Sequence, residues 1–268
     1  MRIITLKDNT FIQKQQATEY QTQNKGGKGS NISNGVQILG SIEDESNIVY
    51  FTNFGRVLPN RGALPLEENE KVVAFGNPTN MLFLITRLGT AKRVQLDKEV
   101  KQPEKVITLE ENDELIQAKF TNGNDDLLIL TASGIALRVH EQEFSVVELS
   151  AVGVRAIQLK DDDSVVDCEI IDDNKQIVFV TQKGVGKRVN CSNFMPHHRN
   201  TNGSIAYKNG ILQACVVPSD EVLIWSQNGK VIKLKSSDIP MRQNNISGGV
   251  ILIRLDEKDA VQGICNAE

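Results

Sequence analysis

The chain repeats one pattern of hydrophobic and polar positions along its whole length. In each copy, a run rich in Val, Ile, Leu and Phe leads into a short turn, and a second run that ends near a basic residue follows the turn. Such a pair predicts a β-hairpin, with glycine in the turn where the backbone needs a positive φ. The turn position is occupied in the six copies by Thr10, Gly55, Gly89, Gly134, Gly184 and Gly229. Their spacings of 45, 34, 45, 50 and 45 residues identify an internal repeat.

A second strand pattern follows most of the hairpins. It is an apolar stretch that ends in an acidic turn, and it recurs at residues 153–163, at 249–257 and, in a degenerate form, at 106–113. Another apolar stretch comes after each, which makes four strands in about 45 residues, the size of a propeller blade. We find no helical apolar periodicity over roughly ten or more residues. The sequence therefore predicts an all-β protein, a single domain over residues 1–268 built as a propeller-like ring of six blades with four strands each.

Composition places the chain among globular proteins. Of its 268 residues, 40% are hydrophobic and 24% are charged, which excludes a disordered tail or a fibrous repeat. The longest uninterrupted apolar run, residues 81–85, is far shorter than the roughly 18 residues of a membrane span, and the start lacks the features of a signal peptide. The spacing of Cys168, Cys191, Cys215 and Cys265 fits neither a disulfide framework nor a zinc clip. We expect a soluble protein of a reducing cytoplasm, with no membrane partner.

The net charge of −4 argues by itself against a polyanionic partner, but the charge is unevenly distributed. Residues 1–30 carry five basic and two acidic side chains, a balance of +3. Residues 181–208 carry five basic side chains and no acid, a balance of +5, whereas residues 97–126 hold nine acids and four lysines, a balance of −5. A separation of this kind can give an acidic molecule a basic face, and a polyanion responds to that local field.

One basic position recurs with the hairpins. The fourth residue after each turn position is, in order, Lys14, Pro59, Arg93, Arg138, Arg188 and Lys233, so five of the six are cationic. Either these are solvated strand ends, or a closed ring arranges them as a curved track for a phosphate backbone. The second interpretation predicts a DNA-binding rim formed by this position and other basic residues of the repeats, namely Lys14, Arg56, Arg61, Lys92, Arg93, Arg138, Lys183, Lys187, Arg188, Arg199, Lys230 and Lys233.

A glycine-rich basic heptapeptide lies between the first two hairpins. It consists of Gln23, Asn24, Lys25, Gly26, Gly27, Lys28 and Gly29, and we call it the box. Its glycines allow the backbone to approach a phosphate closely, and its lysines supply charge. Together with the repeats, the box resembles the C-terminal domain of the DNA gyrase A subunit, whose signature is Q-R-R-G-G-K-G. The resemblance extends over all 268 residues.

The resemblance implies a six-bladed β-pinwheel whose neighbouring blades exchange strands. Such a domain binds, bends and wraps duplex DNA around its basic rim without sequence specificity, so that an ATP-driven type II topoisomerase can introduce negative supercoils. Five box positions match the signature, while Lys25 replaces an arginine by another cation and Asn24 loses the charge. These departures concern the strength of wrapping. They also leave open the paralogous A subunit of topoisomerase IV, in which the domain sets substrate preference and commonly has a degraded box and fewer blades.

The residues predict no chemistry in the chain itself. None of Tyr20, Tyr50 and Tyr207 follows an arginine as the strand-cleaving tyrosine of the family does, and the sequence has no Walker loop, D-x-D cluster or Gly-x-Ser-x-Gly elbow. We therefore expect a non-catalytic module without a cofactor or small-molecule substrate. The partners that the resemblance implies are duplex DNA, the N-terminal breakage-reunion region of the gyrase A subunit, and the gyrase B subunit, in the nucleoid of a bacterial cytoplasm.

Other interpretations compete with DNA wrapping. The net negative charge favours a protein-interaction propeller, although no Trp-Asp or kelch signature marks the repeats. A propeller enzyme would need convergent acids or histidines on its inner strands, which we expect to be aliphatic. Zinc binding by Cys191, His197, His198 and Cys215 is disfavoured, because the spacing fits no common zinc pattern and Cys215 lies in an apolar run. The acidic clusters are expected to be solvated turns rather than calcium loops, and Trp225 to pack in the core.

Overall fold

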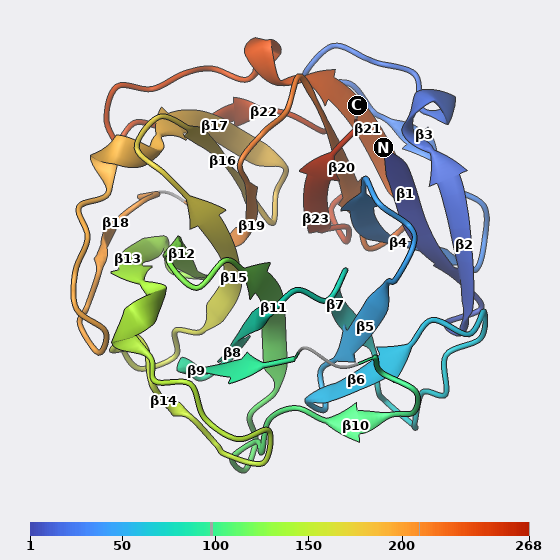
Figure 1. The fold of residues 1–268 in the computed structure, drawn as a ribbon. Coiled ribbons are helices and arrows are strands. Elements are labelled where there is room, and N and C mark those ends of the chain that lie inside the picture. Colours follow the sequence, from blue (N-terminus) through green and yellow to red (C-terminus); the bar gives the residue numbers. More distant parts are fainter. Residues whose placement is uncertain (97–98, 209, 268) are drawn as a thin grey trace.

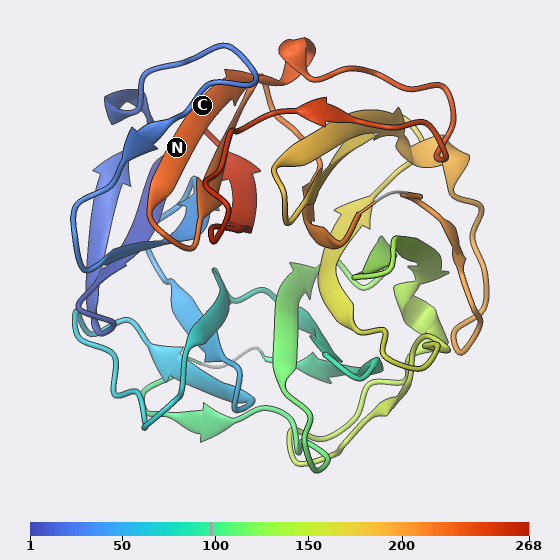
Figure 2. The same ribbon diagram turned by 180° about the vertical axis from the view of Figure 1, so that it is seen from behind.

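The computed structural model describes residues 1–96, 99–208 and 210–267. In this part of the chain, small antiparallel sheets stand around a central axis as the blades of a ring (Figures 1 and 2). We number the blades by their sheets, in the strand orders β2-β1-β4 for blade 1, β10-β6-β5-β7 for blade 2, β11-β8-β9-β14 for blade 3, β15-β12-β13-β18 for blade 4, β19-β16-β17-β22 for blade 5 and β23-β20-β21-β3 for blade 6. The predicted all-β, six-bladed architecture is confirmed.

Each blade is built around one of the repeated hairpins. The hairpin strands are β1 (Arg2–Lys7) and β2 (Phe11–Gln16), β5 (Val49–Thr52) and β6 (Arg56–Pro59), β8 (Met81–Thr86) and β9 (Thr90–Gln95), β12 (Asp126–Thr131) and β13 (Ile135–His140), β16 (Gln176–Thr181) and β17 (Val185–Asn190), and β20 (Glu221–Ser226) and β21 (Lys230–Lys235). The turn glycines of blades 2 to 6 all have positive φ, from +73° to +87°. In blade 1, Asp8 and Asn9 take this conformation instead, which explains why the first copy does not need a glycine at position 10.

The strand that follows each hairpin region lies at the inner side of its blade and faces the axis (Figure 1). These inner strands are β4 (Val36–Ile42), β7 (Val72–Gly76), β11 (Leu115–Thr121), β15 (Val165–Ile171), β19 (Leu212–Val216) and β23 (Val261–Asn266). Each pairs with the first strand of its hairpin, and each ladder contains one shift of register.

The outermost strand of a blade is contributed by the chain of the next blade. These exchanged strands are β3 (Ser30–Asn31), β10 (Glu104–Lys105), β14 (Val154–Arg155), β18 (Ser204–Ile205) and β22 (Val250–Ile251). Thus β14 leaves the hairpin of blade 4 and pairs with β9 of blade 3, and β3 leaves blade 1 and pairs with β21 of blade 6. In blade 1, the exchanged strand is reduced to a bridge between Phe11 and Ala63. We call the chain between a hairpin and its exchanged strand the crossing segment.

Four crossing segments begin with a short 3₁₀-helix: η1 (Ala17–Glu19), η2 (Glu141–Glu143), η3 (Cys191–Asn193) and η4 (Ser236–Asp238). These short turns redirect the chain from one blade toward the outer edge of the blade before it. In the described residues no helix has the length and apolar character needed to cross a membrane.

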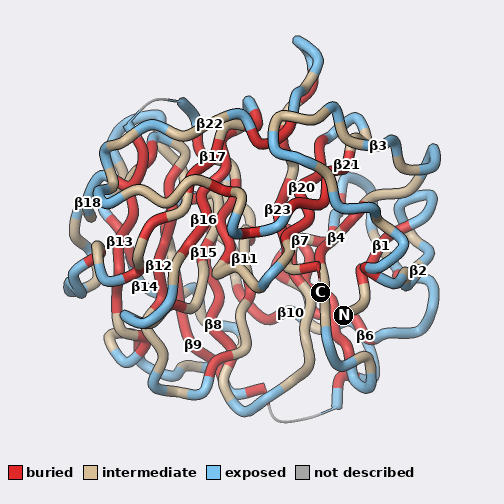
Figure 3. The backbone as a smooth tube through the Cα atoms, turned by 90° about the horizontal axis from the view of Figure 1, so that it is seen from above, coloured by how far each residue is buried: buried red, intermediate tan, exposed pale blue. Residues whose placement is uncertain are grey.

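The core lies between adjacent blades rather than in one central mass. Figure 3 shows the buried residues along the strands. Because each sheet is covered on both faces by its neighbours, the first hairpin strands are buried almost throughout, as in β12 and β16. Aromatic pairs join the crossing segments to the hairpins they pack on, with ring centroids of Phe83 and Phe144 5.2 Å apart and those of Phe179 and Phe194 5.9 Å apart. Trp225 is 5% exposed and packs against Gly263, as a core side chain.

Candidate nucleic-acid interface

The box lies in the crossing segment that joins blade 1 to blade 6. Its backbone is held at its first residue and in its middle. Gln23 N donates to Lys233 O at 2.8 Å, Gly26 N donates to Leu252 O at 2.8 Å, and Gly27 O accepts from Arg254 N at 2.9 Å. The exchanged strand β3 follows directly and completes blade 6. The box is therefore part of the connection that closes the ring.

Two of the box glycines adopt a backbone conformation that favours glycine. Gly26 and Gly29 have φ values of +75° and +71°, a conformation that side chains disfavour. A Cβ atom at Gly29 would lie 2.6 Å from Val231 O, which is closer than any real contact. The glycines thus allow the segment to lie flat against β21.

The cations of the box remain accessible on this fixed frame. Lys25 is exposed, and its ammonium donates to the backbone carbonyl of Asp238 at 2.9 Å. Lys28 is also exposed; after Lys230, it contributes to the field that lowers the pKa of Asp256. Gln23 Nε2 donates to Ser30 Oγ at 3.3 Å. Two positive charges are therefore held at the outer edge of the ring by a rigid backbone.

The recurring cation of the hairpins is placed differently from our expectation of an exposed rim. In blades 3, 4 and 6 the residue is Arg93, Arg138 or Lys233, and its side chain is only 7–10% exposed. Each is paired with a carboxylate: Arg93 with Glu141, Arg138 with Asp126 and Asp173, and Lys233 with Glu221. The prediction that these side chains present free charge to solvent is wrong.

These cations hold the crossing segments in place, and we call them clamp cations. Arg93 Nε donates to Phe144 O at 2.7 Å, and Arg138 Nη1 donates to Phe194 O at 3.1 Å. Their own backbone carbonyls accept from the crossing segment, Arg93 O from Val147 N and Arg138 O from His197 N. In blades 3, 4 and 6 the recurring positive charge is thus explained by strand exchange, because the cation donates to a carbonyl of the segment that crosses there.

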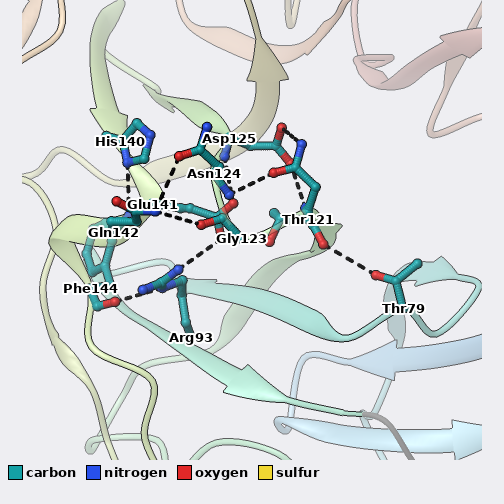
Figure 4. A network of polar contacts seen from close by, with 11 residues as sticks. Thr79, Arg93, Thr121, Gly123, Asn124, Asp125, His140, Glu141, Gln142 and Phe144 are labelled. Atoms are coloured by element: carbon teal, nitrogen blue, oxygen red, sulfur yellow. Dashed lines mark hydrogen bonds and ion pairs between the residues drawn. The ribbon is translucent and has the colours of Figure 1, made fainter.

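Figure 4 shows the environment of one clamp cation. The carboxylate of Glu141 is fully buried and accepts from Thr121 Oγ1 at 2.7 Å and from Asp125 N at 2.7 Å. Arg93 Nη1 lies 3.4 Å from the same carboxylate. This arrangement satisfies the acceptors of a buried charge with groups from blade 3 and from the β11–β12 connection.

Lys92 and Lys187 are buried as well. Each lies one residue before the recurring cation of its hairpin, Arg93 or Arg188, a place that we call the clamp position. Lys92 Nζ donates to the carbonyls of Glu148, Leu149 and Ala151 at 2.8–2.9 Å. Lys187 Nζ donates to carbonyls of the corresponding crossing segment, including Ser247 O at 2.9 Å. Burial lowers the pKa of each lysine to about 8. Both were predicted on the rim; the structure places them beneath it.

Three further rim candidates have carboxylate partners. Lys14 contacts Glu45 at 3.0 Å, and Lys230 contacts Asp256 at 2.7 Å. Arg56 binds Glu67 at 3.0 Å and donates from Nε to the buried Glu70 at 2.8 Å.

The remaining candidates differ in exposure. Arg61 and Lys183 are exposed, whereas Arg188 and Arg199 are half-buried. Arg61 donates to the carbonyl of Lys101, and Arg199 Nη1 donates to Arg155 O at 3.3 Å.

A family of known proteins matches the part of the chain that forms blades 3 to 6. The sequence profile of the family described as "DNA gyrase C-terminal domain, beta-propeller" matches residues 80–98, 125–172, 175–209 and 220–264, which is more than half of the chain. The chain belongs to this family. The match covers blades 3 to 6, where the clamp cations are most regular.

Curated relatives extend the similarity over almost the whole chain. The DNA gyrase A subunit of Aminobacterium colombiense is 31% identical over 293 residues, covering 97% of this chain and 36% of the relative. The corresponding gyrase protein of Clostridium acetobutylicum is 33% identical over 292 residues, covering 93% of this chain and 34% of the relative. The chain therefore spans about a third of the length of these relatives.

Two solved structures share the fold of this gyrase-family chain. A structure of the DNA gyrase A C-terminal domain aligns with a TM-score of 0.86 at 20% identity, covering 98% of both chains. A crystal structure of the C-terminal domain of DNA topoisomerase IV aligns with a TM-score of 0.76 at 20% identity, covering 98% of this chain and 92% of the other.

The structure also reveals exposed cations on this gyrase-family ring that sequence reasoning missed. Lys105 and Arg155 are the second residues of the exchanged strands β10 and β14, and the exposed Arg254 follows β22. Arg155 and Arg254 lie in two copies of the second strand pattern, and Lys105 directly precedes the degenerate copy at residues 106–113. Strand exchange thus places accessible positive charge at the outer edge of the ring.

The cysteines and the acidic turns, which we considered as alternative metal sites, are buried or are bound to other groups of the protein. The four cysteines are buried, and the described residues contain no group of three His, Cys, Asp or Glu side chains that could hold a metal ion. Acids in the turns after the exchanged strands bind the hairpin turns: Asp163 accepts from Ser133 N at 3.0 Å, and Asp259 accepts from Asn228 N at 3.1 Å.

The inner strands are less aliphatic than predicted. A hollow of about 300 Å³ near the axis is lined by Lys119, Asp167 and Glu169. Lys119 contacts Glu169 at 3.2 Å, and burial raises the pKa of Asp167, which accepts from Gln117 Nε2 at 3.1 Å and from Cys215 N at 2.9 Å. These groups satisfy one another, so the centre offers no unpaired catalytic acid among the residues described.

Proposed function

We propose that this chain binds duplex DNA along the outer edge of its ring and bends it, without reading its sequence. The main support for this proposal is the box. Three hydrogen bonds fix its backbone, and it presents the exposed Lys25 and Lys28 beside the junction of blades 1 and 6. Contacts of this kind neutralise phosphates and position a duplex but carry no base information. The exposed cations of the exchanged strands extend the same edge.

The energetics demand several contacts acting together. Smooth bending of 20–30 base pairs by 40–90° costs on the order of 1–6 kcal/mol. Each neutralised phosphate contributes about −0.9 to the slope of log K against log salt concentration. Binding should therefore weaken steeply with salt, and no single exposed cation should account for the wrapping.

Family membership supports a role within a larger enzyme. We infer that the ring is a non-catalytic module of a gyrase-type, ATP-dependent type II topoisomerase in a bacterial cytoplasm, and that it supports negative supercoiling. Its protein partners would be the breakage-reunion region of the gyrase A subunit, and the gyrase B subunit. The ring itself would need no cofactor.

The test is religation of a nicked plasmid on the protein, followed by measurement of the linking-number change. Wild-type protein should shift the linking number, and the Lys25→Ala/Lys28→Ala variant should lose more of this shift than of its DNA affinity, because the box fastens the duplex at one point of a longer path. Equal shifts for the two proteins would refute the role of the box. Salt-insensitive failure to bind any duplex would instead favour a protein-interaction propeller.

A further inference from the structure

Four crossing segments contain a loop, and each of these loops starts at the equivalent structural position. The first residue of each loop donates its N–H to the carbonyl of the residue at the clamp position. The donors and acceptors are Gln23 and Lys233, Val147 and Arg93, His197 and Arg138, and Arg242 and Arg188, at 2.8–3.0 Å. The box is therefore one of a set of loops, and the others can be compared with it residue by residue.

The loop at residues 197–203 has the backbone of the box. Its fourth residue, Asn200, has a φ of +59°, and its seventh, Gly203, has a φ of +67°, close to the +75° and +71° of Gly26 and Gly29. A Cβ atom on Gly203 would lie 2.7 Å from Ala136 O, as one on Gly29 would lie 2.6 Å from Val231 O.

The hydrogen bonds of the two loops correspond as well. Asn200 N donates to Ala156 O at 2.6 Å, and Gln158 N donates to Thr201 O at 2.9 Å. In the box the matching bonds run from Gly26 N to Leu252 O and from Arg254 N to Gly27 O. Parallel bridges join Thr201 to Ile157 and Gly27 to Ile253 in the same register. The two loops are built on one frame.

The loops at 147–153 and 242–249 are of another kind. A buried lysine, Lys92 or Lys187, lies beneath each of them and binds their carbonyls. In the hairpins beneath the box and beneath residues 197–203, the equivalent positions are Ile232 and Leu137, which carry no charge. Arg242, the first residue of its loop, donates from Nε to Gly248 O of the same loop at 3.0 Å. Two loops therefore lie over a buried lysine, whereas the other two lie over an uncharged residue and carry a cation at their third position.

That loop cation occupies the same place in both. Lys25 and Arg199 are the third residues of their loops, and each donates one hydrogen bond to a backbone carbonyl, of Asp238 at 2.9 Å and of Arg155 at 3.3 Å. Glu143 lies beside the second loop. Its carboxylate is 2.9 Å from His198 Nδ1, and its pKa is lowered first by that contact and then by the backbone N–H and the charge of Arg199. A guanidinium held by one bond keeps further N–H groups for a phosphate.

We propose that residues 197–203 form a second phosphate-binding loop for duplex DNA, with Arg199 as its ligating side chain. The inference rests on the proposed function and adds a site to it. The box leads from the hairpin of blade 1 to blade 6, and this loop leads from the hairpin of blade 5 to blade 4, so the two lie two blades apart around the ring. A duplex held by both is fastened at two separated points and must follow the curved edge between them.

The test compares matched variants by salt titration of a short duplex and by plasmid religation. Arg199→Gln and Lys25→Ala should each reduce the magnitude of the salt slope by about 0.9 and reduce the linking-number shift. Asn202→Lys places a cation at the position of Lys28 and should increase both. Two controls change charge elsewhere: Lys160→Ala in an exposed acidic turn, and Asn174→Lys in the connection between β15 and β16. Neither should change the slope or the shift.

The outcomes separate this inference from the proposed function. If Lys25→Ala lowers the slope while Arg199→Gln behaves like Lys160→Ala and Asn202→Lys like Asn174→Lys, the second loop is refuted and DNA wrapping stands. If wild-type protein neither binds duplex in a salt-dependent way nor shifts the linking number, the proposed function itself fails. Circular dichroism monitors folding; should Arg199→Gln not fold, Asn202→Lys, which removes no contact of Arg199, decides the question.

Discussion

Arg93 and Glu141 come from neighbouring blades, and their charged groups meet in the interior with 3.4 Å between Nη1 and Oε2. The carboxylate has no exposed surface, and the arginine also donates to Phe144 O. One ion pair thus joins the hairpin of blade 3 to the crossing segment that leaves blade 4. The strand exchange that builds the outer edge of the ring depends on contacts of this kind.

The first prediction concerns this pair. Glu141→Gln preserves shape but leaves a buried guanidinium without its counter-charge, so we expect the free energy of unfolding to fall by roughly 3 kcal/mol. Urea denaturation measures the change. Glu148→Gln, an exposed acid on the same crossing segment, is the control and should cost less than about 0.5 kcal/mol. Equal effects of the two substitutions would contradict the structural role of Glu141.

The second prediction separates clamp cations from DNA contacts. Arg138→Met removes a buried charge that pairs with Asp126 and Asp173, so it should destabilise the protein without changing the salt slope of DNA binding in the folded state. Lys28→Ala should do the reverse, lowering the magnitude of the slope by about 0.9 with little change in stability. Both readouts come from one salt titration and one urea curve for each variant. A reduced slope for Arg138→Met would restore that residue to the DNA-binding set.

How far the sequence predicts this structure depends on what each pattern encodes. Hairpins, glycine turns and the number of blades follow from local periodicity, and they were predicted correctly. The burial of the Arg138 side chain was not predicted. Alternating residues along a strand separate interior from solvent only when one face of the sheet is exposed. Here both faces are covered by neighbouring blades. Arg138 is therefore buried, and one of its partners, the carbonyl of Phe194, belongs to a segment more than 50 residues away.

The box was easier to locate than the rim. Its glycines mark a position where the backbone approaches another strand, and that requirement is local. The correspondence between Lys25 and Arg199 could not be read from the sequence, since Gly26 is matched by Asn200 and Gly27 by Thr201. Asparagine adopts positive φ more readily than most residues, so the same backbone is produced by a different sequence.

The third prediction concerns closure of the ring. Gly29→Ala combines a positive φ with a Cβ atom 2.6 Å from Val231 O, so β3 should separate from β21. Gly62→Ala is the matched control: its φ is +84°, yet among the described residues no heavy atom lies within 4 Å of the added Cβ. We expect the control to lose about 1 kcal/mol and Gly29→Ala to lose clearly more. Hydrogen exchange of the amides of residues 229–232 should accelerate in Gly29→Ala alone; similar exchange in both variants would contradict the closure role.

The last prediction is a dependence of stability on pH that arises from Lys92 and Lys187. Burial lowers the pKa of each from 10.5 to about 8 in the folded protein. Between these two values the unfolded chain keeps the proton while the folded chain releases it, so the unfolded state binds more protons and stability rises with pH. From pH 7 to pH 9 we expect a gain of about 1 kcal/mol for each lysine.

The measurement is urea denaturation at several pH values between 7 and 9.5. Lys92→Met and Lys187→Met each remove one titrating group, so each variant should show about half of the wild-type gain and the double variant little of it. The gain arises because each ammonium is taken out of water and bound by backbone carbonyls of the crossing segment, without a carboxylate partner among the described residues; Lys187 Nζ also lies 4.8 Å from the centroid of the Tyr207 ring. Clamp cations such as Arg93 show the alternative, a buried charge balanced by an acid. A stability curve that falls over this pH range in the wild type, or is unchanged by both substitutions, would show that the carbonyls compensate fully for burial.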